Sequence, residues 1–149
     1  MSAGKLLGID HGIKRIGVAV CDASQLVARE LTIINRKSKI EDFARLNHIA
    51  AEQNVIGIIV GLPSDLDAPP DIHTQADTVR LWVERYKEIT ALPIVFWDEQ
   101  LTSVDALEIA RQKRRKVTDP IDDLAARLIL QSYLDALRDG LAVPPDQAL

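Results

Sequence analysis

Residues 6–21 read LLGIDHGIKRIGVAVC and give the strongest indication of the fold. It contains two apolar runs, Leu6–Asp10 and Ile16–Cys21, and the second is rich in the β-branched residues that strands favour. The connector His11–Arg15 is short and carries Gly12. Two such runs across a short glycine-bearing connector predict an antiparallel β-hairpin.

The segments after the hairpin alternate between strand-like runs and helical periodicity. We expect further strands at 27–34, 55–60 and 93–97, and helices at 39–54, 73–90, about 102–113 and from 120 onward. The run at 55–60 is continuously apolar, which is typical of a strand covered on both faces.

Three signals predict the ends and faces of the helices. Thr118 or Asp119 is an expected N-cap, with Pro120 at the first position of the last helix. Gly140 is expected just after its C-terminus. In the helix at 39–54, the predicted buried stripe includes Ile40, Phe43 and Leu46.

The predicted order is therefore βββαβαβαα. It indicates an α/β fold with a mixed five-stranded sheet and helices on both faces. We expect a single domain over residues 1–140 and a frayed tail at 141–149.

Length and composition exclude several classes of protein. The 149 residues suit one domain, and 47% hydrophobic with 27% charged residues is typical of a globular chain. The only cysteine, Cys21, excludes an internal disulfide and a cysteine-based zinc site. No apolar run approaches the ~20 residues of a membrane helix, so we expect a cytoplasmic protein without a membrane partner.

Acidic residues follow two of the expected strands and open the last helix. Asp10 ends the first strand, Asp98 and Glu99 end the fifth, and Asp122 and Asp123 begin the helix. If these segments meet at one sheet edge, the carboxylates form a site for Mg²⁺ or Mn²⁺, which prefer oxygen ligands. The alternative is that they are ordinary turn and cap residues.

Helical spacing favours Asp122 over Asp123, because Asp122 lies beside the apolar stripe and Asp123 one turn before Arg127, toward solvent. The residues alone leave open which of Asp98 and Glu99 faces the site.

Basic residues suggest an electrostatic contact with nucleic acid. The net charge is −4, but residues 111–116 carry five cations, among them Arg114, Arg115 and Lys116. Together with Lys14 and Arg15 they are candidates to bind phosphates, although a solvated helix end is the commoner meaning of such a run. Aromatic residues make up only 4%, which favours recognition of backbone and shape over base stacking.

His11 follows Asp10 directly. It is a candidate auxiliary group for metal-bound water or phosphate, and its alternative is an ordinary turn residue.

The sequence resembles the YqgF/RuvX family, the pre-16S rRNA nucleases once described as Holliday-junction-resolvase-like. The matching motifs are Leu7-Gly8-Ile9-Asp10 with Lys14–Val20, Val60–Pro63, Asp98–Ser103, and Asp122 followed by Ala125-Ala126 and Ile129–Leu134. The resemblance implies an RNase H-like fold and cleavage of phosphodiesters with divalent metal ions. By motif position it implies Asp10, Glu99 and Asp122 as the metal-binding and catalytic acids, with Asp98 and Asp123 ranked below them.

The resemblance also implies maturation of the 5′ end of pre-16S rRNA in the cytoplasm. The sequence departs from the family pattern at His11, at Gln100 in place of an arginine, and in the acidic loop at 65–71.

Three hypotheses follow from these observations. The first is a nuclease for structured RNA that uses two metal ions. The second is a resolvase for branched DNA, which would need a symmetric dimer. The third is a module that binds ribosomal RNA without cleaving it. We expect a monomer or a weak homodimer.

Overall fold

The sheet has five strands, and the hairpin supplies two of them. The structure, a computed structural model, describes residues 4–63, 71–98, 111–113 and 120–147. Its strands are β1 (Leu6–His11), β2 (Arg15–Cys21), β3 (Ala28–Asn35), β4 (Gly57–Leu62) and β5 (Ile94–Asp98), in the spatial order β3-β2-β1-β4-β5. β2 is antiparallel to β1 and β3, whereas β1, β4 and β5 are parallel. The predicted hairpin and mixed sheet are thus confirmed.

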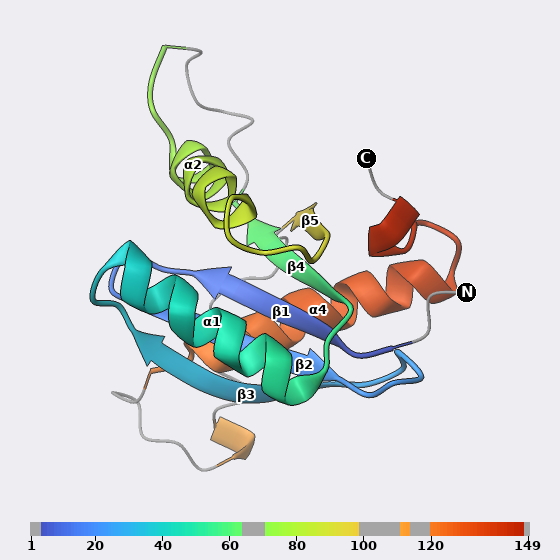
Figure 1. Cartoon of the computed structure of the whole chain (residues 1–149). Helices are drawn as coiled ribbons and strands as arrows, with labels where there is room; N and C mark the ends of the chain where they lie inside the picture. Colours follow the sequence, from blue (N-terminus) through green and yellow to red (C-terminus); the bar gives the residue numbers. More distant parts are fainter. Residues whose placement is uncertain (1–3, 64–70, 99–110, 114–119, 148–149) are drawn as a thin grey trace.

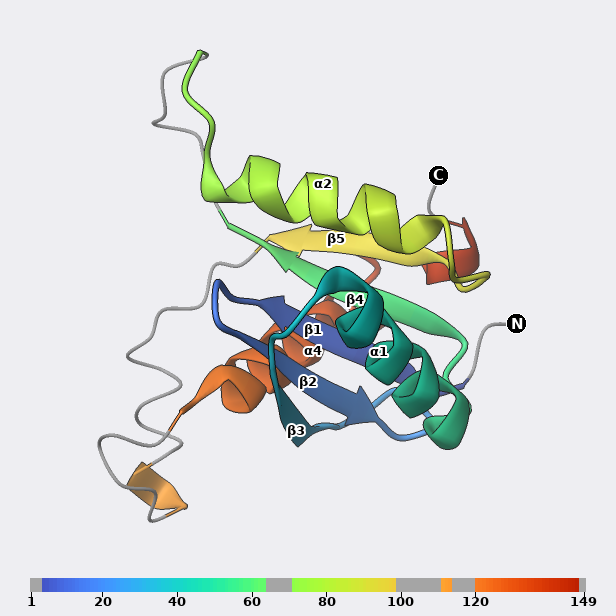
Figure 2. The same cartoon turned by 60° about the vertical axis from the view of Figure 1, so that its left-hand side comes forward.

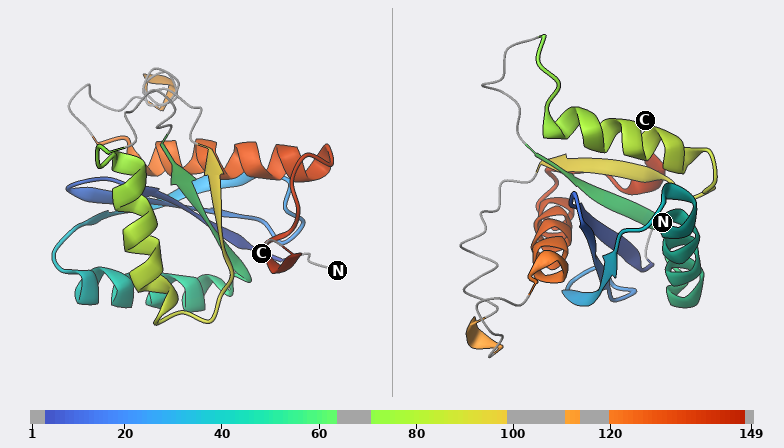
Figure 3. Two further views of the ribbon diagram at one scale, coloured as in Figure 1. Left: turned by 90° about the horizontal axis from the view of Figure 1, so that it is seen from above. Right: turned by 90° about the vertical axis from the view of Figure 1, so that its left-hand side faces the viewer.

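Helices cover both faces of the sheet (Figure 1). The three long ones described are α1 (Lys39–Gln53), α2 (Gln75–Lys87) and α4 (Asp122–Arg138). Figure 3 shows α1 and α4 on opposite sides of the sheet, and Figure 2 shows α2 running alongside β4 and β5. The expected helix at about 102–113 falls almost entirely outside the described residues. No described helix is long and apolar enough to cross a membrane.

Strand alternation divides the core into two layers. Leu7 and Ile9 of β1 pack with α1 and α2, whereas Leu6 packs with α4. Gly8 also faces α4, because a Cβ atom there would lie 2.8 Å from Cβ of Leu130. We call these the α1/α2 face and the α4 face.

The helix ends follow the predicted chemistry in part. Ser38 caps α1 by accepting from the amide of Glu41, and Thr74 forms a capping box with Asp77 at α2. Gly140 follows α4 with a φ of 75°, as expected for a C′ residue.

Two predictions about the helices are wrong. Helix α4 begins at Asp122 rather than at Pro120, and its N-cap Ile121 makes no side-chain cap. Thr118 and Asp119 lie outside the described residues. Ile40 is 83% exposed, because it lies in the first turn of α1, away from the stripe formed by Phe43 and Leu46.

The segment after α4 differs from the expected frayed tail. Residues 145–147 form a short 3-10 helix in which Pro145 is buried, and the Tyr133 hydroxyl donates to the Val143 carbonyl. Gly57 lets Pro145 approach β4 closely, since a Cβ there would lie 2.9 Å from the proline ring. The described residues after Gly140 therefore pack onto the domain.

Candidate active site

The carboxyl ends of three parallel strands meet at one edge of the sheet. Ile9 of β1 pairs with Val60 of β4, and two residues farther along β4 Leu62 pairs with Asp98 of β5. The ends of β1 and β5, and with them Asp10 and Asp98, therefore lie at the same edge. Ligands of open α/β sheets gather at such an edge.

Asp10 lies on the α4 face of this edge. It follows Leu6 and Gly8 in the alternation of β1, and it is partly buried. Asp10 pairs across the hairpin with Gly17 of β2. This pairing places a residue without a side chain directly beside the Asp10 carboxylate.

Gly17 allows the first turn of α4 to lie against the sheet next to Asp10. A Cβ atom on Gly17 would lie only 1.8 Å from the backbone oxygen of Asp122 and 2.8 Å from the amide of Asp123. Only glycine permits this approach. It brings two of the predicted acids, Asp10 and Asp122, to the same place although 112 positions separate them.

Arg15 holds the Asp122 carboxylate. Its Nε atom donates to Oδ1 of Asp122 at 3.0 Å, and the two side chains are 40% and 19% exposed. The other carboxylate oxygen, Oδ2, lies 3.4 Å from where a Cβ on Gly12 would be. The turn of the hairpin therefore surrounds Asp122 on two sides.

Asp123 is not on the solvated face that helical spacing suggested. It is 7% exposed, and its Oδ1 accepts from the amide of Leu124 at 2.9 Å. The reason is that α4 packs against β1, β2 and β3 together, so its buried stripe is broader than the apolar residues alone indicate.

Asp98 is not brought to the Asp10 side chain. It shares the alternation of Ile94 and Phe96, which pack on the α1/α2 face, whereas Val95 and Trp97 pack on the α4 face. Glu99 lies outside the described residues. Within 4–63, 71–98, 111–113 and 120–147 no group of three His, Cys, Asp or Glu residues could hold a metal ion. The described part of the site consists of the two carboxylates of Asp10 and Asp122.

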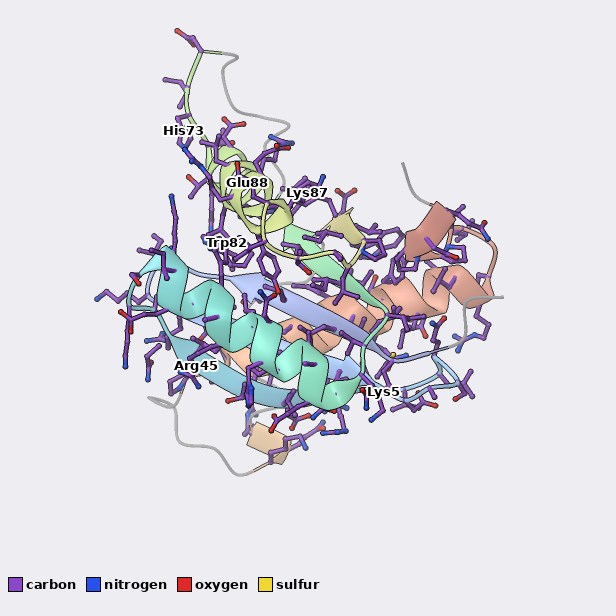
Figure 4. The ribbon with its side chains drawn as sticks, viewed as in Figure 1. Lys5, Arg45, His73, Trp82, Lys87 and Glu88 are labelled. Atoms are coloured by element: carbon purple, nitrogen blue, oxygen red, sulfur yellow. The ribbon has the colours of Figure 1, made fainter. Side chains whose placement is uncertain are left out.

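His11 is neither a turn residue nor a neighbour of the Asp10 carboxylate. It is the last residue of β1, 5% exposed, and it faces α1 and α2. Its ring lies 4.8 Å from that of Trp82, centroid to centroid. In Figure 4 Trp82 lies on the side of α2 that faces α1.

The environment of His11 keeps it neutral. Burial, and after it the nearby charge of Arg36, lower the pKa of His11 to about 4. Its Nε2 is buried without a hydrogen-bond partner among the described residues. His11 therefore belongs to the aromatic core and not to the acidic site.

Several predicted phosphate-binding cations are described, and they differ in their contacts. Lys14 is exposed at the turn of the hairpin, and Arg15 binds Asp122. Arg114, Arg115 and Lys116 lie outside the described residues. Arg36 has a structural role, since its Nη1 donates to the carbonyl of Gly12 at 3.0 Å.

Lys113, in the basic run, is paired with an acid of β3. Its Nζ lies 2.9 Å from Oε2 of Glu30, and Arg127 of α4 lies 3.3 Å from Oε1. Burial alone would raise the pKa of Glu30, but the hydrogen bond and charge of Lys113 and the charge of Arg127 outweigh it, so the pKa is lowered. No sequence signal pointed to this cluster or to the Arg15–Asp122 pair.

Comparison with known proteins identifies the family. The family model described as RuvX, Holliday junction resolvase, matches residues 4–136. The chain belongs to the RuvX family. A protein from Caldanaerobacter subterraneus subsp. tengcongensis named "Putative pre-16S rRNA nuclease" is 39% identical over 143 residues, which cover 91% of this chain and 99% of that one. A protein of the same name from Thermoanaerobacter pseudethanolicus is 42% identical over 142 residues, with the same coverage of both chains.

Among solved structures, the fold resembles that of T. thermophilus RuvC in complex with a Holliday junction substrate. The TM-score is 0.64 at 16% identity, and the match covers 94% of this chain and 98% of that one. The resemblance confirms the expected RNase H-like fold, and membership of the RuvX family confirms the expected class, a nuclease.

Proposed function

We propose that this RuvX-family nuclease cleaves structured RNA with divalent metal ions held by Asp10, Glu99 and Asp122. The observation that carries the proposal is the placement of Asp122 against Gly17, beside Asp10. Carboxylates gathered at one sheet edge repel each other, and a bound divalent cation removes that cost. The donor set is oxygen only, which suits Mg²⁺ or Mn²⁺.

Glu99 lies outside the described residues, and it is proposed as the third acid because Asp98 belongs to the other alternation of β5. Val95 and Trp97 pack on the α4 face, whereas Ile94 and Phe96, which share the alternation of Asp98, pack on the α1/α2 face. The family motif Asp98–Ser103 supports the same choice. Asp98, on the other face, is not part of the proposed set.

The protein's own residues prepare this site for a phosphodiester. Asp10 is fixed by the end of a central strand, and Asp122 by the first turn of α4 and by Arg15. When bound, a pair of ions supplies an activated water and stabilises the leaving oxygen. Arg15 presents positive charge beside the acids, and we propose Lys14, Arg114, Arg115 and Lys116 as further phosphate contacts.

We propose pre-16S rRNA as the substrate and the cytoplasm as the place of action. Support comes from the names of relatives that are 39% and 42% identical over nearly their whole length. Branched DNA is the second candidate, because the family model is described as a Holliday junction resolvase. Junction resolution requires two sites in a symmetric dimer, whereas RNA processing is open to the monomer or weak homodimer expected from the sequence.

The test is a cleavage assay with a labelled pre-16S leader RNA and a four-way DNA junction, each with Mn²⁺ and with chelator. The wild-type protein should cut the RNA only with Mn²⁺. Asp10→Asn should reduce cleavage at least about 100-fold, since it removes a charged ligand. Asp139→Asn, the same change at an exposed residue after α4, is the matched control and should cleave normally.

Each other outcome of this assay has a defined meaning. Preferential cutting of the junction would replace RNA by branched DNA as the substrate. RNA binding without a product at any Mn²⁺ concentration would favour the non-catalytic module. Full activity of Asp10→Asn would contradict the site assignment.

A further inference from the structure

Arg15 is an arginine placed directly on a proposed metal ligand. We infer that Arg15 acts as an internal counter-ion of Asp122 and couples metal binding to the arrival of a substrate phosphate. The inference rests on the proposed function and deepens it, because it concerns how the same site chooses when to bind metal.

The geometry leaves part of the guanidinium available. Arg15 uses Nε to bind Oδ1 of Asp122 at 3.0 Å, and no contact of its two terminal nitrogens is recorded within the described residues. The Arg15 side chain is 40% exposed. A guanidinium presents several donors in one plane, so it can hold a carboxylate through one edge and accept a phosphate on another.

The charges explain the coupling. A divalent ion bound by Asp122 comes within a few ångströms of the Arg15 charge, and the two cations repel each other. Arg15 thereby lowers the affinity of the free protein for the metal. A phosphate group between Arg15 and the metal ion carries negative charge and attracts both cations, which offsets their mutual repulsion. Phosphate binding therefore strengthens metal binding, and metal binding strengthens phosphate binding by the same factor.

The neighbouring cations do not have this role. Arg36 is committed to the carbonyl of Gly12 and lies 3.7 Å from Asp42, on the other side of the hairpin. Lys14 carries the same charge as Arg15 and adjoins it in the chain, but it is exposed at the turn and no ion pair of its side chain is recorded in the described part of the protein. A substitution of Lys14 therefore removes the same charge without removing a contact to Asp122, and it serves as the matched control.

The experiment measures Mn²⁺ affinity directly, by the electron paramagnetic resonance signal of free Mn²⁺. The proteins are wild type, Arg15→Gln, Lys14→Gln and Asp10→Asn, each alone and with a saturating phosphorothioate RNA duplex. Without RNA, Arg15→Gln should bind Mn²⁺ on the order of tenfold more tightly than wild type, and Lys14→Gln should change the affinity less than about twofold. RNA should increase the Mn²⁺ affinity of the wild-type protein. In Arg15→Gln the increase in Mn²⁺ affinity caused by RNA should be much smaller.

Unchanged or weakened Mn²⁺ binding by Arg15→Gln in the absence of RNA would overturn the inference, as would an equal effect of Lys14→Gln. A circular dichroism spectrum and a urea unfolding curve check that Arg15→Gln is folded. If wild type and Asp10→Asn bind Mn²⁺ equally, the proposed metal site itself fails, and the inference with it. If Asp10→Asn abolishes binding but Arg15→Gln matches wild type, only the role of Arg15 fails.

Discussion

Asp10 and His11 are consecutive residues at the end of β1, and they occupy opposite environments. Asp10 lies on the α4 face, partly buried, beside Gly17 and the start of a helix that carries another carboxylate. His11 lies on the α1/α2 face among aromatic rings and is 5% exposed. The α4 face at this edge is built from charges and glycines, and the other face from packed apolar side chains.

The difference shows how one strand can carry a charged side chain on one face and a packed core side chain on the other. A period of two sends neighbouring side chains to different layers, so a charged site needs no gap in the core. The α1/α2 layer is sealed by Phe43, Trp82 and Tyr86, whose rings lie 5.0 to 5.7 Å apart. In the α4 layer Gly17 carries no side chain, and the first turn of α4 occupies that space beside Asp10.

The largest effect on this comparison should come from filling the space beside Asp10. Gly17→Ala places a Cβ atom 1.8 Å from the Asp122 oxygen, and backbone lies on both sides of that contact. The first turn of α4 must shift, which should lower the free energy of unfolding by about 3 kcal/mol and weaken Mn²⁺ binding. Urea unfolding and Mn²⁺ titration measure the two effects.

Gly61→Ala is the matched control on the same face. There the new Cβ would lie 2.5 Å from the end of the Ile129 side chain, and that side chain can rotate away. The free energy of unfolding should therefore fall by only about 1 kcal/mol, and Mn²⁺ binding should be retained. Equal effects of the two substitutions would mean that the start of α4 is not held by Gly17.

A smaller effect should appear on the His11 face as a pH dependence. In the folded protein the pKa of His11 falls from 6.5 to about 4, so between these values the unfolded chain binds more protons. Stability therefore falls as the pH is lowered through this window, by about 2 kcal/mol from this residue between pH 7 and pH 5. His11→Phe should remove that part of the pH dependence.

The comparison is made by urea unfolding at pH 7 and pH 5. His48→Gln removes a histidine that is 73% exposed on α1, and it should leave the pH dependence as in wild type. If His11→Phe and wild type lose the same stability on acidification, His11 is not buried in its neutral form.

The sequence predicted the hairpin, the mixed sheet and the order of strands and helices along the chain because these follow from local patterns. Apolar runs, a glycine connector and helical spacing each depend on a few neighbouring residues. His11 lies on the face opposite Asp10, as strand alternation requires. The sequence did not predict this, because the predicted strand ended at Asp10, whereas the observed strand continues by one residue.

Other features of the site depend on contacts that no local pattern contains. Arg15 and Asp122 are 107 positions apart, and nothing around either residue indicates the other. In the sequence Gly17 is an ordinary strand glycine, and only the structure shows that α4 packs directly against it. The burial of Asp123 likewise follows from the breadth of sheet under α4, and not from its own neighbours in the chain.

If metal binds on the α4 face at the end of β1, an anomalous-difference map from crystals soaked in Mn²⁺ will locate it. We expect a peak within about 2.1 Å of carboxylate oxygens of both Asp10 and Asp122. A peak at other residues only, or none at these two carboxylates at high Mn²⁺ concentration, would contradict it.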